Sequence, residues 1–223
     1  MGGLEGTVET LLRAAKGTKA PVALHLDHAT SEDYCRAAVD AGFSSVMFDG
    51  SALPYAQNTA STRRICEYAH RAGVSCEGEL GRLRGEEGAI SNPESAQTDP
   101  HEALRFYAET GVDALAPSIG TAHGVYTFEP HLNIPRLRQI HALLPKVPLV
   151  LHGGSGTGDE NLAKATREGI SKVNLATDLY KAGAAAVIEE EPNHGMQMYE
   201  LLAEGYKAKL VHYMKLFNQC NRV

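Results

Sequence analysis

Residues 149–156 read Leu149-Val150-Leu151-His152-Gly153-Gly154-Ser155-Gly156. Three apolar side chains in a row predict a strand that is buried on both faces, and the histidine and glycines that follow end it abruptly. Buried strands of this kind are typical of parallel sheets whose faces are covered by helices. The segment therefore predicts an α/β fold with a polar, glycine-rich turn at the carboxyl end of this strand.

Five other short apolar runs share this form, and a helical pattern separates each one from the next. The six predicted strands are Val22–Asp27, Ser45–Asp49, Val74–Leu80, Ala114–Ile119, Leu149–His152 and Val173–Ala176. Thr30 or Ser31 can cap the helix after the first strand, and Gly42 ends it. Asp99 caps a later helix that Gly111 ends. This alternation predicts repeated βα units.

Strand runs alone leave two architectures open, an open doubly wound sheet and a TIM (β/α)8-type barrel. Polar side chains stand at the carboxyl end of nearly every predicted strand, where barrel active sites lie. A complete barrel needs roughly 250 residues, so a single domain over residues 1–223 with about six units is expected to be incomplete. The long polar segment 81–98 is predicted to be a mobile active-site loop. Apolar spacing over 196–217 predicts a final amphipathic helix.

The overall composition limits the kinds of partner. The chain has 21 basic and 27 acidic residues, a formal charge of −6 and 43% hydrophobic residues, which fits one soluble globular domain. This charge balance gives no electrostatic footprint for nucleic acid or a membrane surface. No membrane-length apolar run or signal peptide is found, so we expect a cytoplasmic protein that acts on small molecules. Its four cysteines form no close pair, so no disulfide framework or cysteine zinc site is predicted.

Three histidines follow three different predicted strands: His28, His123 and His152. A single histidine at a strand end is more often a capping or core residue than a ligand, but three that converge reverse this interpretation. They can supply three neutral nitrogens to Zn²⁺ and leave a fourth position for water or substrate. His25 stands in the middle of a predicted strand and is expected to be buried and hydrogen-bonded instead.

Two polar turns follow the last two predicted strands. Gly153-Gly154-Ser155 offers backbone N–H groups and a hydroxyl, and Asn174–Thr177 leads into a helix start near Asp178. Both turns suit a phosphate. A glycine-rich turn alone is weak evidence, because many strand–helix turns carry glycine for steric reasons. The place of these two turns, however, matches the usual phosphate site of barrel enzymes.

Six segments carry this chemistry in order along the chain: Val22–His28, Phe48–Ser51, Glu79–Leu83, Ser118–Gly124, Leu149–Gly156 and Lys172–Thr177. Together they resemble the class II, zinc-dependent ketose-bisphosphate aldolases, which include the fructose- and tagatose-bisphosphate enzymes. The resemblance implies a lyase of glycolysis and carbohydrate metabolism. Such an enzyme reversibly cleaves a ketose 1,6-bisphosphate to dihydroxyacetone phosphate and an aldehyde through a metal-stabilised enediolate. A homodimer or larger assembly is also implied.

The resemblance assigns roles to residues at the predicted metal site. It makes His28, His123 and His152 the ligands of the catalytic zinc. Zinc in this position can polarise the ketone carbonyl of the substrate. Asp27 matches the catalytic acid, which exchanges a proton with the hydroxyl that becomes the aldehyde. Glu87 matches the proton-abstracting residue, on a loop that can close after substrate binds.

Further positions match binding groups of the family. Asp49 and Glu79 match a second divalent-ion position, and the alternative is that they orient the ligand histidines through hydrogen bonds. A monovalent cation, Na⁺ or K⁺, is implied near the turn carbonyls. The residues that match the dihydroxyacetone phosphate site are Gly124, Gly153, Gly154, Ser155, Asn174, Leu175, Ala176 and Thr177.

The chain departs from the family pattern at its start and at two later positions. The family has two βα units before the His-Asp strand, whereas about twenty residues precede it here, so these two units are expected to be missing. Arg84 stands where the loop usually has glycine, and Pro117 lacks an N–H for the sheet. One alternative is therefore a catalytically impaired, truncated protein that retains metal and phosphate binding. Another is a zinc hydrolase, although the paired phosphate turns argue against it.

Overall fold

The computed structural model describes residues 3–81, 97–121 and 131–220. Within these residues, strands and helices alternate as predicted. The strands are β1 (His25–Ala29), β2 (Ser45–Phe48), β3 (Ser75–Leu80), β4 (Ala114–Pro117), β5 (Leu149–Leu151) and β6 (Ile170–Val173). The helices are α1 (Gly3–Ala15), α2 (Glu32–Ala41), α3 (Tyr55–Arg71), α4 (Pro100–Thr110), α5 (Ile134–Leu143), α6 (Asp159–Arg167), α7 (Thr177–Glu190) and α8 (Gly195–Leu216).

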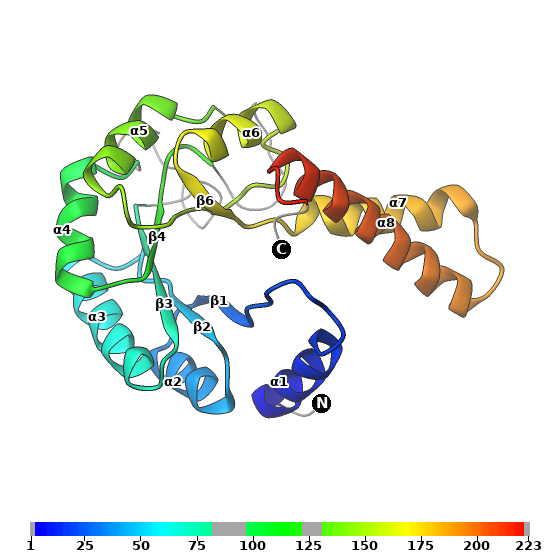
Figure 1. Ribbon diagram of the computed structural model, residues 1–223, viewed down its shortest axis with the longest axis horizontal. Coiled ribbons are helices and arrows are strands. Elements are labelled where there is room, and N and C mark those ends of the chain that lie inside the picture. Colours follow the sequence, from blue (N-terminus) through cyan, green and yellow to red (C-terminus); the bar gives the residue numbers. More distant parts are fainter. Residues whose placement is uncertain (1–2, 82–96, 122–130, 221–223) are drawn as a thin grey trace.

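The strand order decides between the two architectures that the sequence leaves open. All strand pairs are parallel, and the spatial order β1-β2-β3-β4-β5-β6 repeats the order in sequence. A doubly wound sheet reverses direction at a switch point, whereas a barrel adds every strand on the same side. Figure 1 shows the strands as a curled sheet with α2 to α6 along its outer side. The barrel-type prediction is confirmed.

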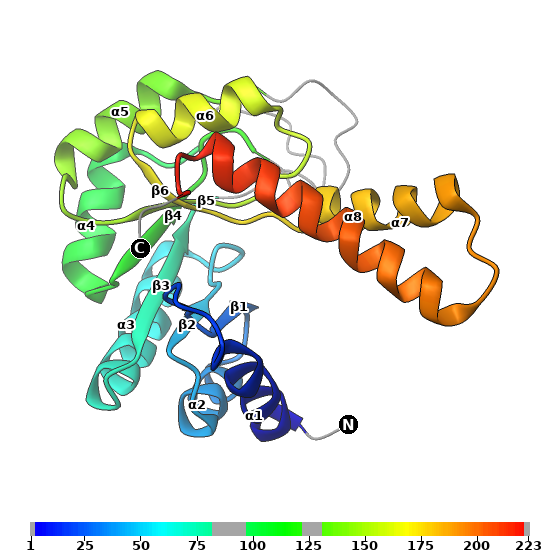
Figure 2. The same cartoon turned by 45° about the vertical axis from the view of Figure 1, so that its right-hand side comes forward.

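The barrel is incomplete in the part of the chain that the structure describes. There, β1 and β6 form the two ends of the sheet, and each pairs with a single neighbouring strand. Beyond β6, α7 and α8 run side by side and project away from the sheet in both Figure 1 and Figure 2. The carboxyl ends of the parallel strands face the same side, so the side chains that follow them are brought together.

Capping residues position the helices that flank these strands. Ser31 begins α2 by accepting a hydrogen bond from the backbone N–H of Tyr34, and Gly42 ends it in the left-handed conformation (φ 102°). Asp99 caps the start of α4 through its side chain, and Gly111 (φ 71°) ends that helix. These predicted helix ends are confirmed.

The first and last strands have different bounds from those predicted. Regular pairing of β1 with β2 starts at His25. Val22, where the strand was predicted to begin, lies outside the sheet and is 62% exposed. His25 is therefore the first residue of β1 rather than its middle. The last strand begins earlier than predicted, at Ile170, and ends at Val173. Asn174 already belongs to the following turn, where its carbonyl oxygen accepts a hydrogen bond from the N–H of Gly154 (3.1 Å).

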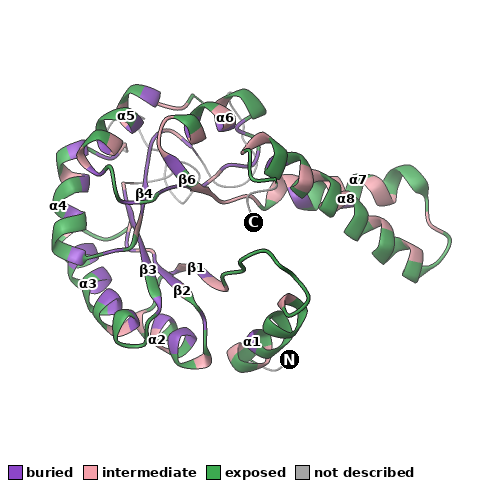
Figure 3. Ribbon diagram, viewed as in Figure 1, coloured by how far each residue is buried: buried purple, intermediate pink, exposed green. Residues whose placement is uncertain are grey.

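The core lies between the strands and the helices that cover them, and Figure 3 shows buried residues on the facing surfaces of both. Much of α7 and α8 is exposed in the same view. These two helices approach closely at glycines, since a Cβ at Gly183 would lie 2.8 Å from the carbonyl oxygen of Leu202. Among the described residues, no helix is both long enough and apolar enough to span a membrane.

Candidate active site

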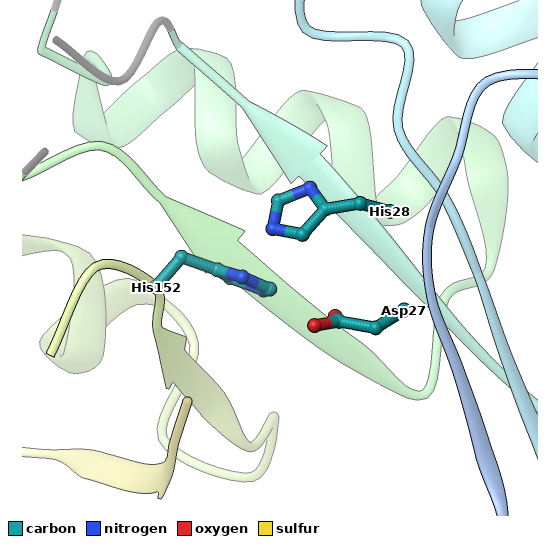
Figure 4. Close-up of side chains that lie close together, drawn as sticks. All are labelled: Asp27, His28 and His152. Atoms are coloured by element: carbon teal, nitrogen blue, oxygen red, sulfur yellow. The ribbon is translucent and has the colours of Figure 1, made fainter. Parts of the chain in front are cut away.

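A distortion in β1 brings two neighbouring side chains to the same place. Neighbouring residues in a strand normally point to opposite faces of the sheet. His28, however, has a φ of 50°, and the pairing with β2 shifts register between Leu26 and Ala29. Such a conformation costs a non-glycine residue about 1–3 kcal/mol and is concentrated at functional sites. As a result, Asp27 and His28 both lie close to His152, which follows β5 (Figure 4).

These three side chains form a compact donor group. One nitrogen or oxygen atom from each of Asp27, His28 and His152 lies within 4.8 Å of the other two. The imidazole rings meet edge to face, with their centroids 4.4 Å apart. Neutral imidazole nitrogens and carboxylate oxygens are typical zinc ligands. The donor chemistry of this group therefore fits the zinc ion that the sequence predicts.

A carboxylate from β2 holds one of the two rings. Asp49 Oδ2 lies 2.9 Å from His28 Nδ1, and Ser51 donates to Oδ1 from its backbone N–H (3.1 Å) and its hydroxyl (2.7 Å). Burial opposes ionisation of Asp49, but the hydrogen bonds from His28 and Ser51 outweigh it and lower the pKa to about 2. Donor atoms of His28, Asp49 and Glu79 also lie within 4.8 Å of one another. The geometry is compatible with both interpretations of Asp49 and Glu79, ring orientation and a second cation.

Two glutamates of β3, Glu77 and Glu79, lie on the same face of the sheet because they are two residues apart. That face is the inner one. Glu77 and Glu79 are both 2% exposed. Between them, Gly78 faces the helices, where a Cβ would lie 3.0 Å from the side chains of Thr62 and Val112. Glycine is therefore the residue that lets α3 and α4 pack directly on this strand while its neighbours serve the site.

Glu77 contacts the second ring and a lysine. Its Oε1 lies 2.8 Å from His152 Nε2, and its Oε2 lies 2.9 Å from Lys172 Nζ in β6. Burial would raise the pKa of Glu77, but the hydrogen bond to His152 and the charge of Lys172 lower it to about 2. The sequence marks Glu77 only as one of several possible ligand or acid–base groups at strand ends, and it gives Lys172 no role of its own. The spacing of Glu77 from Glu79 was the available sign that both share one face.

Asn174 and His25 complete the polar network. The side-chain amide nitrogen of Asn174 lies 3.0 and 3.2 Å from the two carboxylate oxygens of Asp27 and 3.1 Å from His152 Nδ1. His25 is partly buried, and its Nδ1 forms a 2.8 Å hydrogen bond with the Ser45 hydroxyl. Burial and the nearby Lys172 lower the pKa of His25. The prediction that His25 is hydrogen-bonded is thus confirmed, whereas its burial is only partial and its position in the strand is corrected.

The two predicted phosphate turns lie against each other beside the histidines. Ser155 Oγ accepts hydrogen bonds from the backbone N–H groups of Ala176 (3.1 Å) and Asp178 (3.2 Å). A Cβ at Gly154 would lie 2.8 Å from Val173 Cγ1, so only glycine permits this contact. A cavity of about 340 Å³ opens here, lined by Asp27, His28, His152, Gly153, Gly154, Ser155, Val173, Asn174, Leu175, Ala176 and Thr177.

Several residues with predicted roles lie outside the described ranges. They are Glu87, His123 and Gly124, together with most of segment 81–98 and its Arg84. The described residues place the remaining predicted positions at the carboxyl ends of β1, β2, β3, β5 and β6. Asp27, His28 and His152 reach one cavity with the phosphate turns, whereas Asp49 and Glu79 form a second donor group with His28 and do not line that cavity.

Comparison with known proteins identifies the family. The sequence matches the family described as class-II fructose-bisphosphate aldolase over residues 1–222. The chain belongs to this family. This result confirms the resemblance that its motifs indicate.

Aldolase relatives agree with this chain in sequence and in fold. The fructose-bisphosphate aldolase of Staphylococcus aureus (strain Mu50) is 42% identical over 180 residues, which cover 81% of this chain and 62% of that protein. The Geobacillus stearothermophilus fructose-bisphosphate aldolase is 40% identical over 197 residues, covering 84% of this chain and 68% of that protein. The solved structure of the YdjI aldolase from Escherichia coli K12 is 32% identical, with a TM-score of 0.85, and the match covers 96% of this chain and 76% of that chain. This aldolase-family chain thus spans less than two thirds of the staphylococcal relative.

Proposed function

We propose that this chain carries the active centre of a metal-dependent aldolase. The reaction is the reversible cleavage of a ketose 1,6-bisphosphate, of the fructose or tagatose type, to dihydroxyacetone phosphate and an aldehyde. One observation carries the proposal: Asp27, His28 and His152 converge in the same cavity as the turns Gly153–Ser155 and Asn174–Thr177. Membership of the aldolase family supports it, as do the relatives named fructose-bisphosphate aldolases.

The proposed zinc ligands are His28 and His152 together with His123. A bound zinc ion supplies Lewis-acid polarisation of the substrate ketone. The contribution of the chain is to hold the rings before the ion arrives. Asp49 bonds His28 at 2.9 Å, and Glu77 bonds His152 at 2.8 Å. Such carboxylate partners fix the orientation of a ligand ring and raise its basicity.

Neighbouring groups would hold the proposed additional ions. The donor atoms of His28, Asp49 and Glu79, which lie within 4.8 Å of one another, offer a place for a second divalent ion. Carboxylate oxygens and an imidazole nitrogen suit such an ion. A monovalent cation, Na⁺ or K⁺, is proposed at the carbonyl oxygens of the phosphate turns on the strength of the family resemblance.

Asp27 is the proposed proton carrier for bond cleavage. When the bond between C3 and C4 of the substrate breaks, the C4 hydroxyl gives its proton to Asp27 and becomes the aldehyde. The electron pair stays on C3 and is delocalised into the C2 carbonyl. Asn174 donates to both oxygens of Asp27 and thus holds the carboxylate in place. Glu87 is the proposed group that moves the proton at C3.

The phosphate of the dihydroxyacetone half is proposed to bind at the two turns. Backbone N–H groups of a glycine turn and of a helix start bind anions well. Ser155 ties the turns together, because its hydroxyl oxygen accepts from the N–H groups at the start of α7. Gly154 lets the first turn lie directly on the second. The remaining proposed contacts are made by Gly124, Gly153, Leu175 and Thr177.

A zinc hydrolase is the alternative from another reaction class. The same histidines can activate a water molecule. The phosphate-type turns in the same cavity favour the aldolase, since a simple ester hydrolase has no need of them. Hydrolysis of esters that is unaffected by sugar phosphates would favour the hydrolase.

Hydrogen exchange at dihydroxyacetone phosphate tests the proposal. Purified protein loaded with zinc is incubated with this compound in heavy water, and NMR follows loss of the C3 proton signal. An aldolase exchanges one C3 proton of dihydroxyacetone phosphate even when no aldehyde is present. In the direction of bond formation, it removes this proton before the aldehyde reacts, so deuterium from the solvent can replace it. We expect exchange that stops when zinc is removed by a chelator. Zinc-loaded protein that catalyses no exchange would contradict the proposal.

A further inference from the structure

A buried carboxylate connects the ring of His152 to the far end of the sheet. Glu77 lies in β3, and its two oxygens contact His152 Nε2 (2.8 Å) and Lys172 Nζ (2.9 Å). An ionised carboxylate that is 2% exposed requires compensation of its charge. Lys172 supplies that compensation from β6. Glu77 is therefore held as an anion with a fixed direction toward the imidazole.

This contact determines which nitrogen of His152 carries the proton. An ionised carboxylate can only accept hydrogen bonds, so the 2.8 Å contact places a proton on Nε2 of His152. In a neutral imidazole, the other nitrogen, Nδ1, then bears a lone pair.

The contacts of Asn174 agree with the same assignment. Its amide nitrogen lies 3.1 Å from His152 Nδ1 and 3.0 Å from Asp27 Oδ1. The opposite orientation of the amide would place its oxygen against the carboxylate of Asp27, which is repulsive. Because the amide nitrogen is a donor, Nδ1 of His152 is the acceptor in the metal-free protein. A metal ion bound at Nδ1 would take the place of this hydrogen bond. The two neighbours of the ring thus indicate one tautomer independently.

We propose that Glu77, held by Lys172, is a positioning residue that fixes His152 in the Nε2–H tautomer and so presents its Nδ1 lone pair to the donor group formed with Asp27 and His28. The inference rests on the proposed function, in which His152 binds a metal, and it names the residue that selects the ligating nitrogen. The pairing at His28 is reversed, because Asp49 contacts Nδ1 there. The two rings would therefore bind a metal ion through different nitrogens, His28 through Nε2 and His152 through Nδ1.

The tautomer of the wild-type protein is the first test and needs no variant. Metal-free protein labelled with ¹⁵N-histidine is studied by long-range ¹H–¹⁵N NMR, which shows which ring nitrogen carries the proton. The His152 signals are those that disappear in His152→Gln. We expect His152 to be protonated at Nε2. Protonation at Nδ1 would overturn the inference.

A variant pair supplies the second test. In Glu77→Gln, Lys172 attracts the amide oxygen, so the amide NH₂ faces Nε2 of His152 and favours the opposite tautomer. We expect Zn²⁺ affinity, measured by competition with a chromophoric chelator, to fall by about 10–100-fold. Asp113→Asn is the matched control, since Asp113 forms a carboxylate–histidine pair with His70 (2.8 Å) outside the cavity, and the new amide oxygen can still accept from the Cys76 N–H that Asp113 holds. Its zinc affinity should equal that of the wild type, and equal affinity in Glu77→Gln would overturn the inference.

These tests separate the inference from the proposed function. Neither the tautomer nor the zinc affinity depends on cleavage of a sugar phosphate. If zinc binds and Glu77→Gln weakens it, but the wild type catalyses no exchange, the aldolase proposal fails and the role of Glu77 stands. If exchange is catalysed but Glu77→Gln binds zinc as tightly as the wild type, the role of Glu77 fails and the aldolase proposal stands.

Discussion

Asp27 and His28 are neighbours in sequence but have different roles in the proposed reaction. Asp27 is proposed to accept the proton of the C4 hydroxyl, so Asp27→Asn should lower kcat for cleavage by about 10²–10⁴-fold. The Asn174 amide can still donate to the oxygen of the new side chain, so the site should keep its shape. Zinc content, measured by atomic absorption, should match the wild type. Loss of zinc together with activity would instead identify Asp27 as a ligand.

The sequence was sufficient to predict some site residues and not others. His28 and His152 each follow an apolar strand, so their meeting could be predicted from the fold class alone. The link between Glu77 and Lys172 could not, because it joins residues 95 positions apart across the inside of the sheet. The bulge at His28 was also unpredictable, since no glycine marks it. Contacts that depend on the curvature of the sheet and on the register of its strands cannot be predicted from sequence patterns.

The turn after β5 is the element on which phosphate binding is proposed to depend. A Cβ at Gly154 would meet the Asn174 carbonyl oxygen at 2.9 Å and would push the two phosphate turns apart. Gly154→Ala should therefore raise KM for the sugar bisphosphate about tenfold, equivalent to about 1.4 kcal/mol of binding. Gly17→Ala is the control, because nothing lies within 4 Å of a Cβ there. An unchanged KM in Gly154→Ala would remove the turn from the substrate site.

An ion-pair cluster joins α2 to α3. Hydrogen bonds from Arg64, with help from Ser61 and Arg36, lower the pKa of Glu32 from 4.5 to about 2. A lowered pKa in the folded state gives stability that is present above pH 4.5 and is lost as the pH falls toward 2. Glu32→Gln should thus lower the free energy of unfolding by about 1 kcal/mol at pH 7, since water screens the pair.

The difference in the free energy of unfolding between Glu32→Gln and the wild type should become smaller as the pH falls from 5 to 2. Urea unfolding followed by circular dichroism at several pH values measures it. Glu9→Gln serves as the control, because the Glu9–Arg13 pair on α1 is strongly exposed. A constant difference across this pH range would show that the Glu32 carboxylate contributes nothing through its charge.

Element ends were predicted with different success for physical reasons. Caps such as Ser31 and Asp99 act within a few residues, so their helices could be predicted locally. The ends of β1 and β6 depend on pairing with a neighbouring strand, and both were misplaced by about three residues. Helix α1 was not predicted at all. It contributes a single buried side chain, Val8, to the core.

Metal binding should stabilise the molecule as a whole. The proposed ligands come from both sides of the curled sheet, His28 from β1 and His152 from the end of β5. Zinc at 100 times its dissociation constant adds about 2.7 kcal/mol to the free energy of unfolding. We expect a cooperative thermal transition whose Tm rises with zinc in the wild type but not in His152→Gln. A broad transition that zinc does not shift would favour the catalytically impaired alternative.

Aldolase activity of this chain is measured as cleavage of a ketose bisphosphate by purified protein, before and after metal exchange. The protein is stripped with a chelator, reloaded with zinc, and supplied with saturating fructose 1,6-bisphosphate or its tagatose epimer, while dihydroxyacetone phosphate is measured. We predict that cleavage is lost on stripping and returns in proportion to zinc bound. Protein that binds zinc and substrate but releases no dihydroxyacetone phosphate from either sugar would contradict the proposed aldolase activity.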